Sequence, residues 1–224
     1  MTDDCRVPSR SGLDPSNIGR SYDRVASRYA DEFVDELGYK PLDRALLAVL
    51  AADVRRGGHG PIADLGSGPG HVASFLAGHG ADVLALDLAP NMATIAHHRL
   101  GVNAVAGSLA SLPFGAATLG GATAFYCLIH LDDDGLDAAA EELARVVARG
   151  GPVLAAFHTG DEVRHLDEWW EEEVDLDFRF LEARQVTDRL DHAGFTTEAV
   201  LVRASYPQEI DTQRTYVLAR RNAA

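Results

Sequence analysis

The sequence has little cysteine and no long apolar run. Its 224 residues include 2 cysteines, Cys5 and Cys127, which are too few for the disulfide framework of a small secreted domain. No stretch approaches the roughly 18 consecutive apolar residues of a membrane-spanning helix, and the first residues lack the apolar segment of a signal peptide. We therefore expect a cytoplasmic protein in a reducing compartment.

Positive charge is also scarce. Lys40 is the only lysine, and 34 acidic against 20 basic residues give a formal net charge of −14. A surface that binds nucleic acid needs a basic face to neutralise phosphates, and an anionic membrane surface would repel this chain for the same reason. We expect neither partner and predict a small-molecule acceptor instead. The sequence leaves monomer and homodimer open.

The composition is otherwise that of a globular protein, with 46% hydrophobic and 24% charged residues, and the length suits one α/β domain. Residues 1–16 are rich in Ser, Pro, Gly and Asp and are expected to form a flexible tail, followed by a single domain over residues 17–224. Helical spacing of apolar residues over Ile18–Leu37 and a second helix from Pro41 predict an N-terminal helical lid over residues 17–57.

Beyond residue 60, short apolar runs alternate with amphipathic segments. This alternation predicts βαβ units and a parallel sheet. The expected strands are Ile62–Leu65, Asp82–Asp87, Ala104–Ala106, Gly121–Leu128 and Pro152–Phe157. The expected helices are His71–Gly78, Pro90–Leu100, Asp132–Ala148 and Arg184–His192.

Two further strands are expected at the C-terminal end, Thr196–Ala204 and Thr215–Arg220. The loop between them is too short to hold a crossover helix, so they should be antiparallel neighbours. The expected fold is an α/β, Rossmann-like, doubly wound sheet of seven strands, mostly parallel and closed by a C-terminal antiparallel hairpin.

The strongest functional motif is Asp64-Leu65-Gly66-Ser67-Gly68-Pro69-Gly70, between a buried strand and a helix. Glycines let the backbone turn sharply and approach a ligand with no Cβ in the way, and the helix that follows presents free N–H groups and the positive end of its dipole. The dinucleotide fingerprint G-x-G-x-x-G is not met, because His71 stands where the third glycine belongs. An acidic residue beside the loop can instead face a cationic ligand. The alternative is an ordinary tight strand–helix turn.

Asp87 stands at the tip of the next expected strand. A carboxylate at this place can accept hydrogen bonds from both hydroxyls of a ribose. NAD enzymes share this feature, so Asp87 predicts an adenosine-type ligand but does not distinguish NAD from other ligands of this type. Its alternative role is to cap the helix that opens near Pro90.

Together these segments resemble the motif series of small-molecule class I S-adenosylmethionine-dependent methyltransferases, of the group similar to ubiquinone and menaquinone biosynthesis enzymes. The resemblance covers roughly residues 18–221 and includes the terminal antiparallel hairpin. It rests on four motifs in order, Asp64–Gly70, Asp87–Met92, Gly107–Phe114 and Phe125–Leu131.

The resemblance implies S-adenosyl-L-methionine as cofactor and S-adenosyl-L-homocysteine as product. Asp87 would hold the ribose, Leu88 and Met92 would enclose the adenine, and Ser108 and Leu109 would meet its edge. The family usually carries Asp where Ser108 stands, so this contact lacks charge assistance here. The other residues that the resemblance places at the cofactor are Asp64, Gly66, Ser67, Gly68, Gly70 and Tyr126.

The acceptor side is less constrained. A sulfonium methyl is already activated, so the protein has to align the nucleophile, exclude water and, where needed, remove a proton. The candidate catalytic residues are Tyr22 and Tyr29 on the N-terminal helix, and His130, which is expected to end the fourth strand and could act as a general base. The alternatives are core packing for the tyrosines and a hydrogen bond that shapes the pocket for His130.

Residues 159–181 are expected to form an acceptor-side insertion. Four apolar residues recur there at helical spacing, Val163, Leu166, Trp170 and Val174. This spacing favours a lid helix with a solvated acidic side. Alternatively, an aromatic and acidic wall that includes Trp169 and Glu172 would suit a cationic amine acceptor.

The predicted function is methyl transfer to O, N or C of a small metabolite. Two alternatives stay open, an NAD(P)-dependent oxidoreductase of the Rossmann type and a non-catalytic S-adenosylmethionine-binding module. No metal site is expected, because the histidines are scattered and the neighbours His97 and His98 point apart on a helix.

Overall fold

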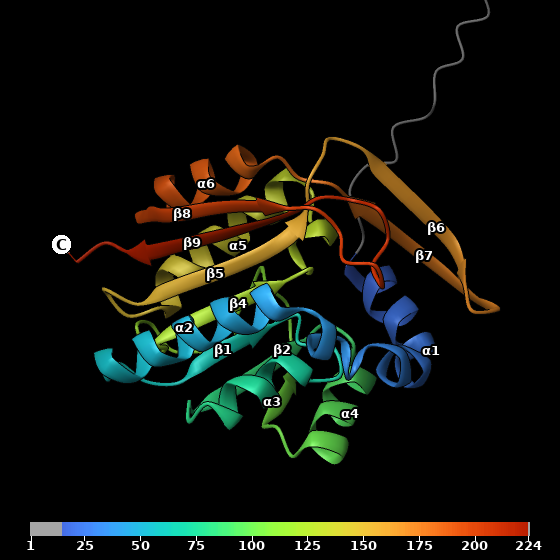
Figure 1. Cartoon of the computed structure of the whole chain (residues 1–224), viewed down its shortest axis with the longest axis horizontal. Coiled ribbons are helices and arrows are strands. Elements are labelled where there is room, and N and C mark those ends of the chain that lie inside the picture. The colour runs from blue at the N-terminus through green and yellow to red at the C-terminus, as the bar shows by residue number, and fades with distance from the viewer. Residues whose placement is uncertain (1–14, 224) are drawn as a thin grey trace, which may run out of the picture.

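A computed structural model describes residues 15–223 of the chain. Seven strands form one sheet in the order β3-β2-β1-β4-β5-β9-β8 (Figure 1). β1 to β5 are parallel, whereas β9 runs antiparallel to both of its neighbours. The strands are β1 (Ile62–Leu65), β2 (Val83–Asp87), β3 (Ala104–Ala106), β4 (Gly121–Phe125), β5 (Pro152–His158), β8 (Phe195–Arg203) and β9 (Arg214–Arg221). The predicted doubly wound sheet with its C-terminal antiparallel hairpin is confirmed.

Helices cover both faces of this sheet (Figure 1). On one face lie α2 (Pro41–Gly57), α3 (His71–Gly78) and α4 (Pro90–Leu100), which pack against Ile62 and Val83. On the other lie α5 (Asp133–Val146) and α6 (Ala183–His192), which pack with Ala63 and Leu65 in the largest buried cluster. Because both faces are covered, the central strands are apolar throughout, which is why they could be recognised in the sequence.

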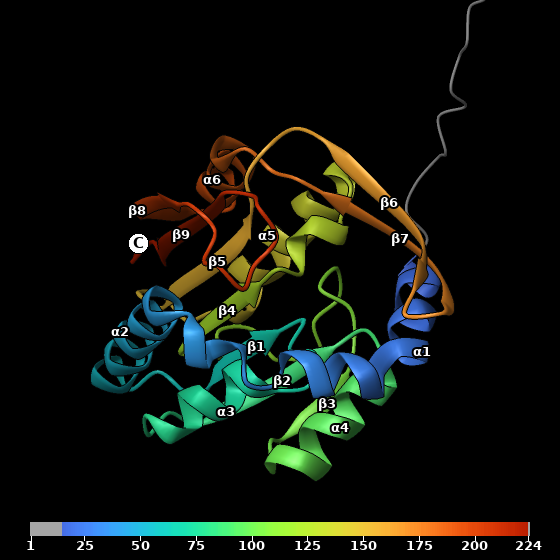
Figure 2. The ribbon, with the colours of Figure 1, turned by 45° about the vertical axis from the view of Figure 1, so that its right-hand side comes forward.

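α1 (Pro15–Phe33) and a separate hairpin, β6 (Val163–Trp169) and β7 (Glu172–Arg179), lie beyond the carboxyl ends of the parallel strands (Figure 2). Ile18 and Val25 of α1 are buried against Val174 and Leu176 of the hairpin. Polar contacts join the same two elements, because Arg24 donates to the Glu173 carbonyl at 2.7 Å and the Asp175 N–H donates to Ser21 Oγ at 2.9 Å. We call α1 and the β6–β7 hairpin the cap.

The N-terminal helices differ in their bounds from the prediction. The expected helix Ile18–Leu37 is two elements, α1 and the 3-10 helix η1 (Glu36–Tyr39). Pro41 begins α2, and a residue before proline is held out of helical geometry; Lys40 accordingly has φ −109° and ψ 74°. Pro15 and Ser16, expected in the tail, already belong to α1, while the rest of that tail and Cys5 lie outside the described residues.

The predicted lid helix within residues 161–177 is wrong, because this segment forms the β6–β7 hairpin. Its turn is made by Trp170 and Glu171, with φ of 56° and 69°. The apolar residues of β7 alternate with aspartates, in the order Val174, Asp175, Leu176, Asp177 and Phe178, which is the period of a strand. The same residues also carry a weaker helical spacing. Burial of β7 against α1 selects the strand over the helix.

The predicted strand Gly121–Leu128 is too long. β4 ends at Phe125 because Tyr126 takes a φ of 57°, and a 3-10 helix, η2 (Leu128–His130), follows. His130 therefore lies in η2 and not at the end of the strand. The remaining predicted elements begin and end within one or two residues of the observed bounds.

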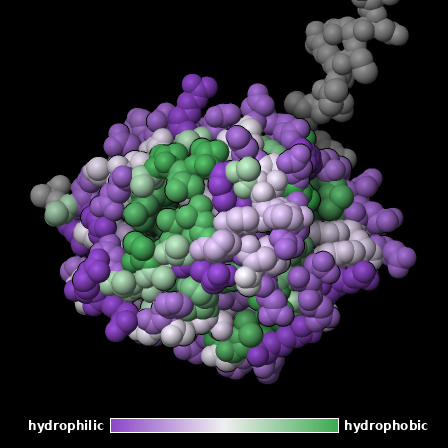
Figure 3. Space-filling model, in the orientation of Figure 1, coloured by the Kyte–Doolittle hydropathy of each residue, from purple (hydrophilic) through white to green (hydrophobic). Residues whose placement is uncertain are grey.

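One face of the molecule carries an apolar patch over α2 and the β8–β9 hairpin (Figure 3). The large exposed apolar side chains of these elements are Val49 on α2 and Val200, Leu201 and Val202 on β8. Since β8 is the outermost strand, the patch includes an edge of the sheet. None of the helices described is long and apolar enough to cross a membrane.

A test of the packing between α3 and α4 comes from Gly70. It has φ 87°, and a Cβ there would lie 2.7 Å from Cβ of Ala96 on α4; Gly101 has φ 67° with no atom within 4 Å of such a Cβ. We expect Gly101→Ala to lower the free energy of unfolding by about 1–2 kcal/mol through backbone strain. Gly70→Ala adds an overpacking cost of about 1–3 kcal/mol. Urea unfolding measures both, and equal losses would contradict the close α3–α4 contact.

Candidate functional site

A cavity lies at the carboxyl ends of β1, β2 and β4, beneath the cap. In a doubly wound sheet this is the switch point where ligands bind. The predicted site residues that line it are Tyr22, Tyr29, Asp64, Gly66, Ser67, Gly68, Asp87, Leu88, Met92, Ser108, Leu109, Tyr126 and His130. Gly70 alone among the predicted residues does not line it, because the space for its side chain is filled by α4.

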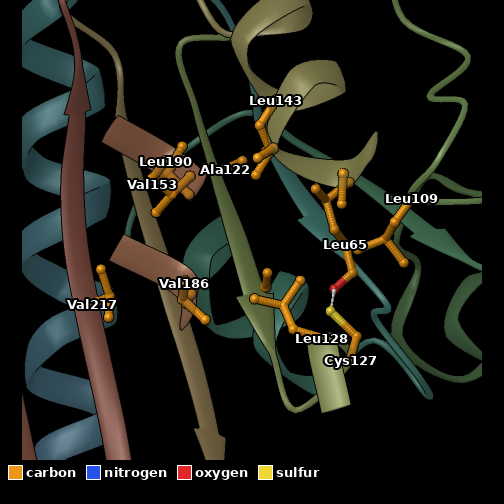
Figure 4. Close-up of a cluster of buried hydrophobic side chains, with 14 of the residues drawn as sticks. Leu65, Leu109, Ala122, Cys127, Leu128, Leu143, Val153, Val186, Leu190 and Val217 are labelled. Atoms are coloured by element: carbon orange, nitrogen blue, oxygen red, sulfur yellow. Dashed lines mark hydrogen bonds between the residues drawn. The ribbon is translucent and has the colours of Figure 1, made fainter. Parts of the chain in front are cut away.

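The glycine-rich turn after β1 is closely packed against the end of β4. Gly66 has φ 63°, and a Cβ there would lie only 2.2 Å from Cβ of Cys127. The Cys127 thiol donates to the Leu65 carbonyl at 3.2 Å (Figure 4). Burial raises the pKa of this thiol far above its ordinary range, so Cys127 is a packing residue of the cavity floor and not a nucleophile.

Asp87 joins this turn to the tip of β2. Its Oδ2 accepts from the Gly68 N–H at 2.7 Å and its Oδ1 from the Ala89 N–H at 2.9 Å. Burial raises the pKa of Asp87 to about 6, so the carboxylate is ionised at neutral pH. Each oxygen can accept a further hydrogen bond, which leaves acceptor capacity facing the cavity. The N-cap of α4 is Ala89, so the alternative role predicted for Asp87 is not observed.

Asp64, on β1, has a carboxylate that is only half satisfied. Its Oδ1 accepts from the Thr123 hydroxyl at 2.7 Å, while Oδ2 is buried without a partner among residues 15–223. Burial raises the pKa of Asp64 to about 6. Within the same part of the chain, Ser67 Oγ and His71 Nδ1 are buried without a partner as well. Buried polar atoms are normally paired, so these atoms mark the place of a polar ligand group.

The residues that hold His71 could not be recognised from the sequence. Glu36 of η1 contacts His71 Nε2 at 3.0 Å and Lys40 Nζ at 2.6 Å, and Lys40 also lies 3.5 Å from Glu209. Burial by itself raises the pKa of Glu36, but the hydrogen bonds and charges of His71 and Lys40 outweigh it and hold that pKa below its ordinary value. Glu36 and His71 both line the cavity.

Tyr22 of α1 and His130 of η2 meet across the cavity, with the Tyr22 hydroxyl 2.8 Å from Nε2. His130 Nδ1 lies 2.9 Å from the carbonyl oxygen of Asp177 on β7. A carbonyl can only accept, so Nδ1 carries the proton and Nε2 accepts from Tyr22. Burial lowers the pKa of His130 to about 4, and the imidazole is therefore uncharged at neutral pH.

Tyr29 packs beside this pair, with its ring 5.8 Å from that of Tyr22 and 5.6 Å from that of Trp169. Burial raises the pKa of both tyrosines, so they act as neutral hydroxyls. Trp169 and Glu172 are cross-strand partners in the hairpin, but neither lines the cavity. The aromatic and acidic wall considered for an amine acceptor is therefore not part of the cavity lining.

Further lining residues that the sequence did not single out are Ile18, Phe125, Leu131, Asp132 and Gly135. Within residues 15–223 no group of three or more His, Cys, Asp or Glu side chains is placed to hold a metal ion. The cavity thus combines buried carboxylates, a neutral histidine and apolar walls.

Residues 62–151 match the family model described as "Methyltransferase domain". This part of the chain is similar to a methyltransferase domain. The match runs from β1 through α5, which is less than half of the chain, and it omits both parts of the cap. The matched residues thus supply the glycine-rich turn and Asp87, while Tyr22 and the Asp177 carbonyl come from outside the match.

Several solved structures share the fold over nearly the whole chain. Magnesium protoporphyrin IX methyltransferase (ChlM) from Synechocystis PCC 6803 has a TM-score of 0.71 at 16% identity, over 96% of this chain and 100% of that one. The 1,6-didemethyltoxoflavin-N1-methyltransferase of Burkholderia thailandensis has 0.65 at 21% identity, over 93% and 87%. The [4+2]-cyclase SpnF has 0.69 at 17% identity, over 95% and 98%. No curated protein sequence matches the chain.

Because the buried carboxylate of Asp64 lacks one hydrogen-bond partner in the described part of the chain, we expect its charge to lower the free energy of unfolding at neutral pH. The pKa of Asp64 is about 6 in the folded protein and about 3.9 in the unfolded chain. The protonated carboxyl therefore favours the folded state. This contribution to the free energy of unfolding is complete below about pH 4 and is lost as the pH rises through about 6. We expect Asp64→Asn to raise the free energy of unfolding of the ligand-free protein at neutral pH by about 1–3 kcal/mol, and by little near pH 4. Urea unfolding at both pH values measures the difference.

The matched control is Asp188→Asn on the exposed side of α6, which should leave the unfolding free energy within about 0.5 kcal/mol at both pH values. A loss of stability in Asp64→Asn at neutral pH would contradict the prediction. It would mean that Oδ2 has a partner and that the carboxylate charge does not lower the free energy of unfolding.

Proposed function

We propose that the protein is an S-adenosylmethionine-dependent methyltransferase that acts on a small-molecule acceptor. The observation that carries the proposal is the convergence of Asp64, Asp87 and the glycine-rich turn of the matched domain on one cavity at the switch point. ChlM is described with bound SAM and with bound SAH, and the toxoflavin methyltransferase with S-adenosylhomocysteine. The fold supports a binding site of the same kind here.

The cavity residues fit the chemical groups of this cofactor. The unpartnered Oδ2 of Asp64 suits the ammonium group of the methionine part, and the free acceptor capacity of Asp87 suits the ribose hydroxyls. Leu88, Met92 and Leu109 give the apolar contacts that an adenine needs. When bound, the cofactor supplies a methyl group on a sulfonium, whose leaving group departs as a neutral thioether.

The work of this chain is then to orient the acceptor, exclude water and manage a proton. The cap lies over the cavity, where His130 is buried and Tyr22 of the cap is partly buried. The neutral imidazole of His130 has an unprotonated Nε2, which accepts a hydrogen bond from the Tyr22 hydroxyl. Such an imidazole can serve as a general base. We assign His130 and Tyr22 to the acceptor side, with Tyr29 as a wall of the same space.

An NAD(P)-dependent oxidoreductase is disfavoured by the charge of the cavity. A dinucleotide brings a pyrophosphate to the glycine-rich turn, where this chain places the buried carboxylate of Asp64. No arginine or lysine of the described chain lines the cavity to offset this charge. The net charge of −14 supports a small-molecule acceptor over nucleic acid, and the assignments to the cytoplasm and to a monomer or homodimer stay predictions.

The proposal is tested by calorimetric titration with S-adenosylmethionine. We expect binding by the wild type and a loss of affinity of about 100-fold in Asp87→Ala, because hydrogen bonds to a charged group are removed. Asp188→Ala, on the exposed face of α6, should bind like the wild type. Absence of binding by the wild-type chain would end the proposal.

Methyl transfer itself is tested with cofactor labelled in its methyl group and incubated with a cell extract. A labelled product that forms only with the wild-type chain is the expected result. Because the [4+2]-cyclase SpnF shares the fold, the fold alone does not imply methyl transfer, and binding without any labelled product would favour the non-catalytic alternative.

A further inference from the structure

The cavity has an end that the cofactor roles leave unused. The lining residues there come from α1, from the end of η2, and from the turn and first residues of α5 that follow it, and they are Ile18, Tyr22, His130, Leu131, Asp132 and Gly135. Ile18, Leu131 and Gly135 form apolar parts of the wall, and the other three residues carry its polar side-chain atoms. The inference below rests on the proposed function, in which this end receives the acceptor.

The polar side-chain atoms at this end are hydrogen-bond acceptors. Tyr22 uses its proton on His130 Nε2, so its oxygen offers the cavity only lone pairs, and His130 uses its own proton on the Asp177 carbonyl. Asp132 accepts from the Gly135 N–H at 2.9 Å and is a carboxylate. A ligand group placed against these atoms has to donate a hydrogen bond, and an anionic group would meet no counter-charge.

Methylation of a hydroxyl also releases a proton, and the same atoms give it a route. As the acceptor oxygen forms its bond to the methyl carbon and the carbon–sulfur bond breaks, the hydroxyl proton moves to the Tyr22 oxygen and the Tyr22 proton moves to His130 Nε2. Tyr22 is left as a neutral phenol. The imidazolium keeps its Nδ1–H bond to the Asp177 carbonyl.

The basicity of His130 limits which acceptors this route can serve. The ring is buried against Phe178 and Tyr22, and burial lowers its pKa to about 4. The acceptor itself meets the Tyr22 oxygen, which takes up one proton as it passes another to Nε2, so a hydroxyl of an acidity similar to that of this phenol, with a lone pair kept for attack, matches the exchange. An alkylammonium would have to lose its proton before it could attack, and an aliphatic alcohol holds its proton too tightly.

We propose that the acceptor is an uncharged phenol or enol, and that Tyr22 takes its hydroxyl proton while passing its own to His130. A binding experiment on the protein loaded with S-adenosylhomocysteine tests the first part. The probes are 4-nitrophenol, its methyl ether 4-nitroanisole and the anion 4-nitrobenzoate, with 1-naphthol and 1-methoxynaphthalene as a larger pair.

The phenols should bind at least about tenfold more tightly than their ethers, which lack the donor proton, and 4-nitrobenzoate should bind most weakly. Tyr22→Phe should abolish the preference for phenol over ether. Tyr39→Phe, a tyrosine of η1 that does not line the cavity, should keep it. Equal affinity for phenol and ether, tighter binding of the benzoate, or no binding of either ring size would overturn the proposal.

The second part is tested by single-turnover transfer of labelled methyl to whichever phenol binds. His130→Gln can still accept the Tyr22 hydrogen bond but cannot take up a proton, so we expect unchanged phenol affinity with transfer slowed at least about 100-fold. Unchanged transfer, or phenol binding by the wild type without any transfer, would contradict the proton route. Binding of S-adenosylhomocysteine is measured first by calorimetry. If this compound does not bind, the proposed function fails. If it binds but the loaded protein shows no selectivity for phenols, only the present inference is overturned.

Discussion

The hydrogen bond from the Gly68 N–H to Asp87 is the contact on which the cavity depends. It joins the turn after β1 to the tip of β2, two strands that are neighbours in the sheet but are separated by α3 in the chain. The carboxylate is buried, so this bond forms away from competing water and both of its oxygens are held in place. With Asp87 fixed, the positions of Leu88 and Met92 follow from the start of α4.

A second constraint gathers the proton-handling groups from three distant segments. Tyr22 lies on α1, His130 on η2 and the Asp177 carbonyl on β7, and a chain of two hydrogen bonds connects them. The pair therefore exists only while the cap is in place, since displacement of either α1 or the hairpin would remove one partner. Water exclusion and assembly of the base depend on the same contacts, which is a known way to couple closure to chemistry.

The sequence was informative where one residue type has one structural meaning. The run of glycines after a buried strand, the aspartate at the tip of the next strand and the apolar parallel strands were all recognisable, because each follows from local backbone geometry or from burial on two faces. The cavity accordingly gathers nearly all of the predicted residues. Gly70 is the predicted residue that does not line the cavity, since a glycine that admits a helix and a glycine that admits a ligand look alike in a sequence.

Other parts of the site could not be predicted for physical reasons. The β6–β7 segment carries a helical and a strand pattern at once, and only its burial against α1 selects the strand. The group that fixes the tautomer of His130 is a backbone carbonyl. Every residue has one, so no residue type in the sequence indicates this contact. The contact between Glu36 and His71 joins η1 to the first turn of α3 and depends on how the chain turns before Pro41.

The burial of Lys40 has a practical consequence for work with this protein. It is the single lysine of the sequence, it is only 5% exposed, and its ammonium is held between Glu36 and Glu209. Reagents that modify lysine side chains, including fluorescent esters, biotin esters and aldehyde crosslinkers, therefore find no accessible lysine. A surface or a dye cannot be attached through a lysine of the folded protein, and reaction of Lys40 itself would report that the segment around η1 has opened.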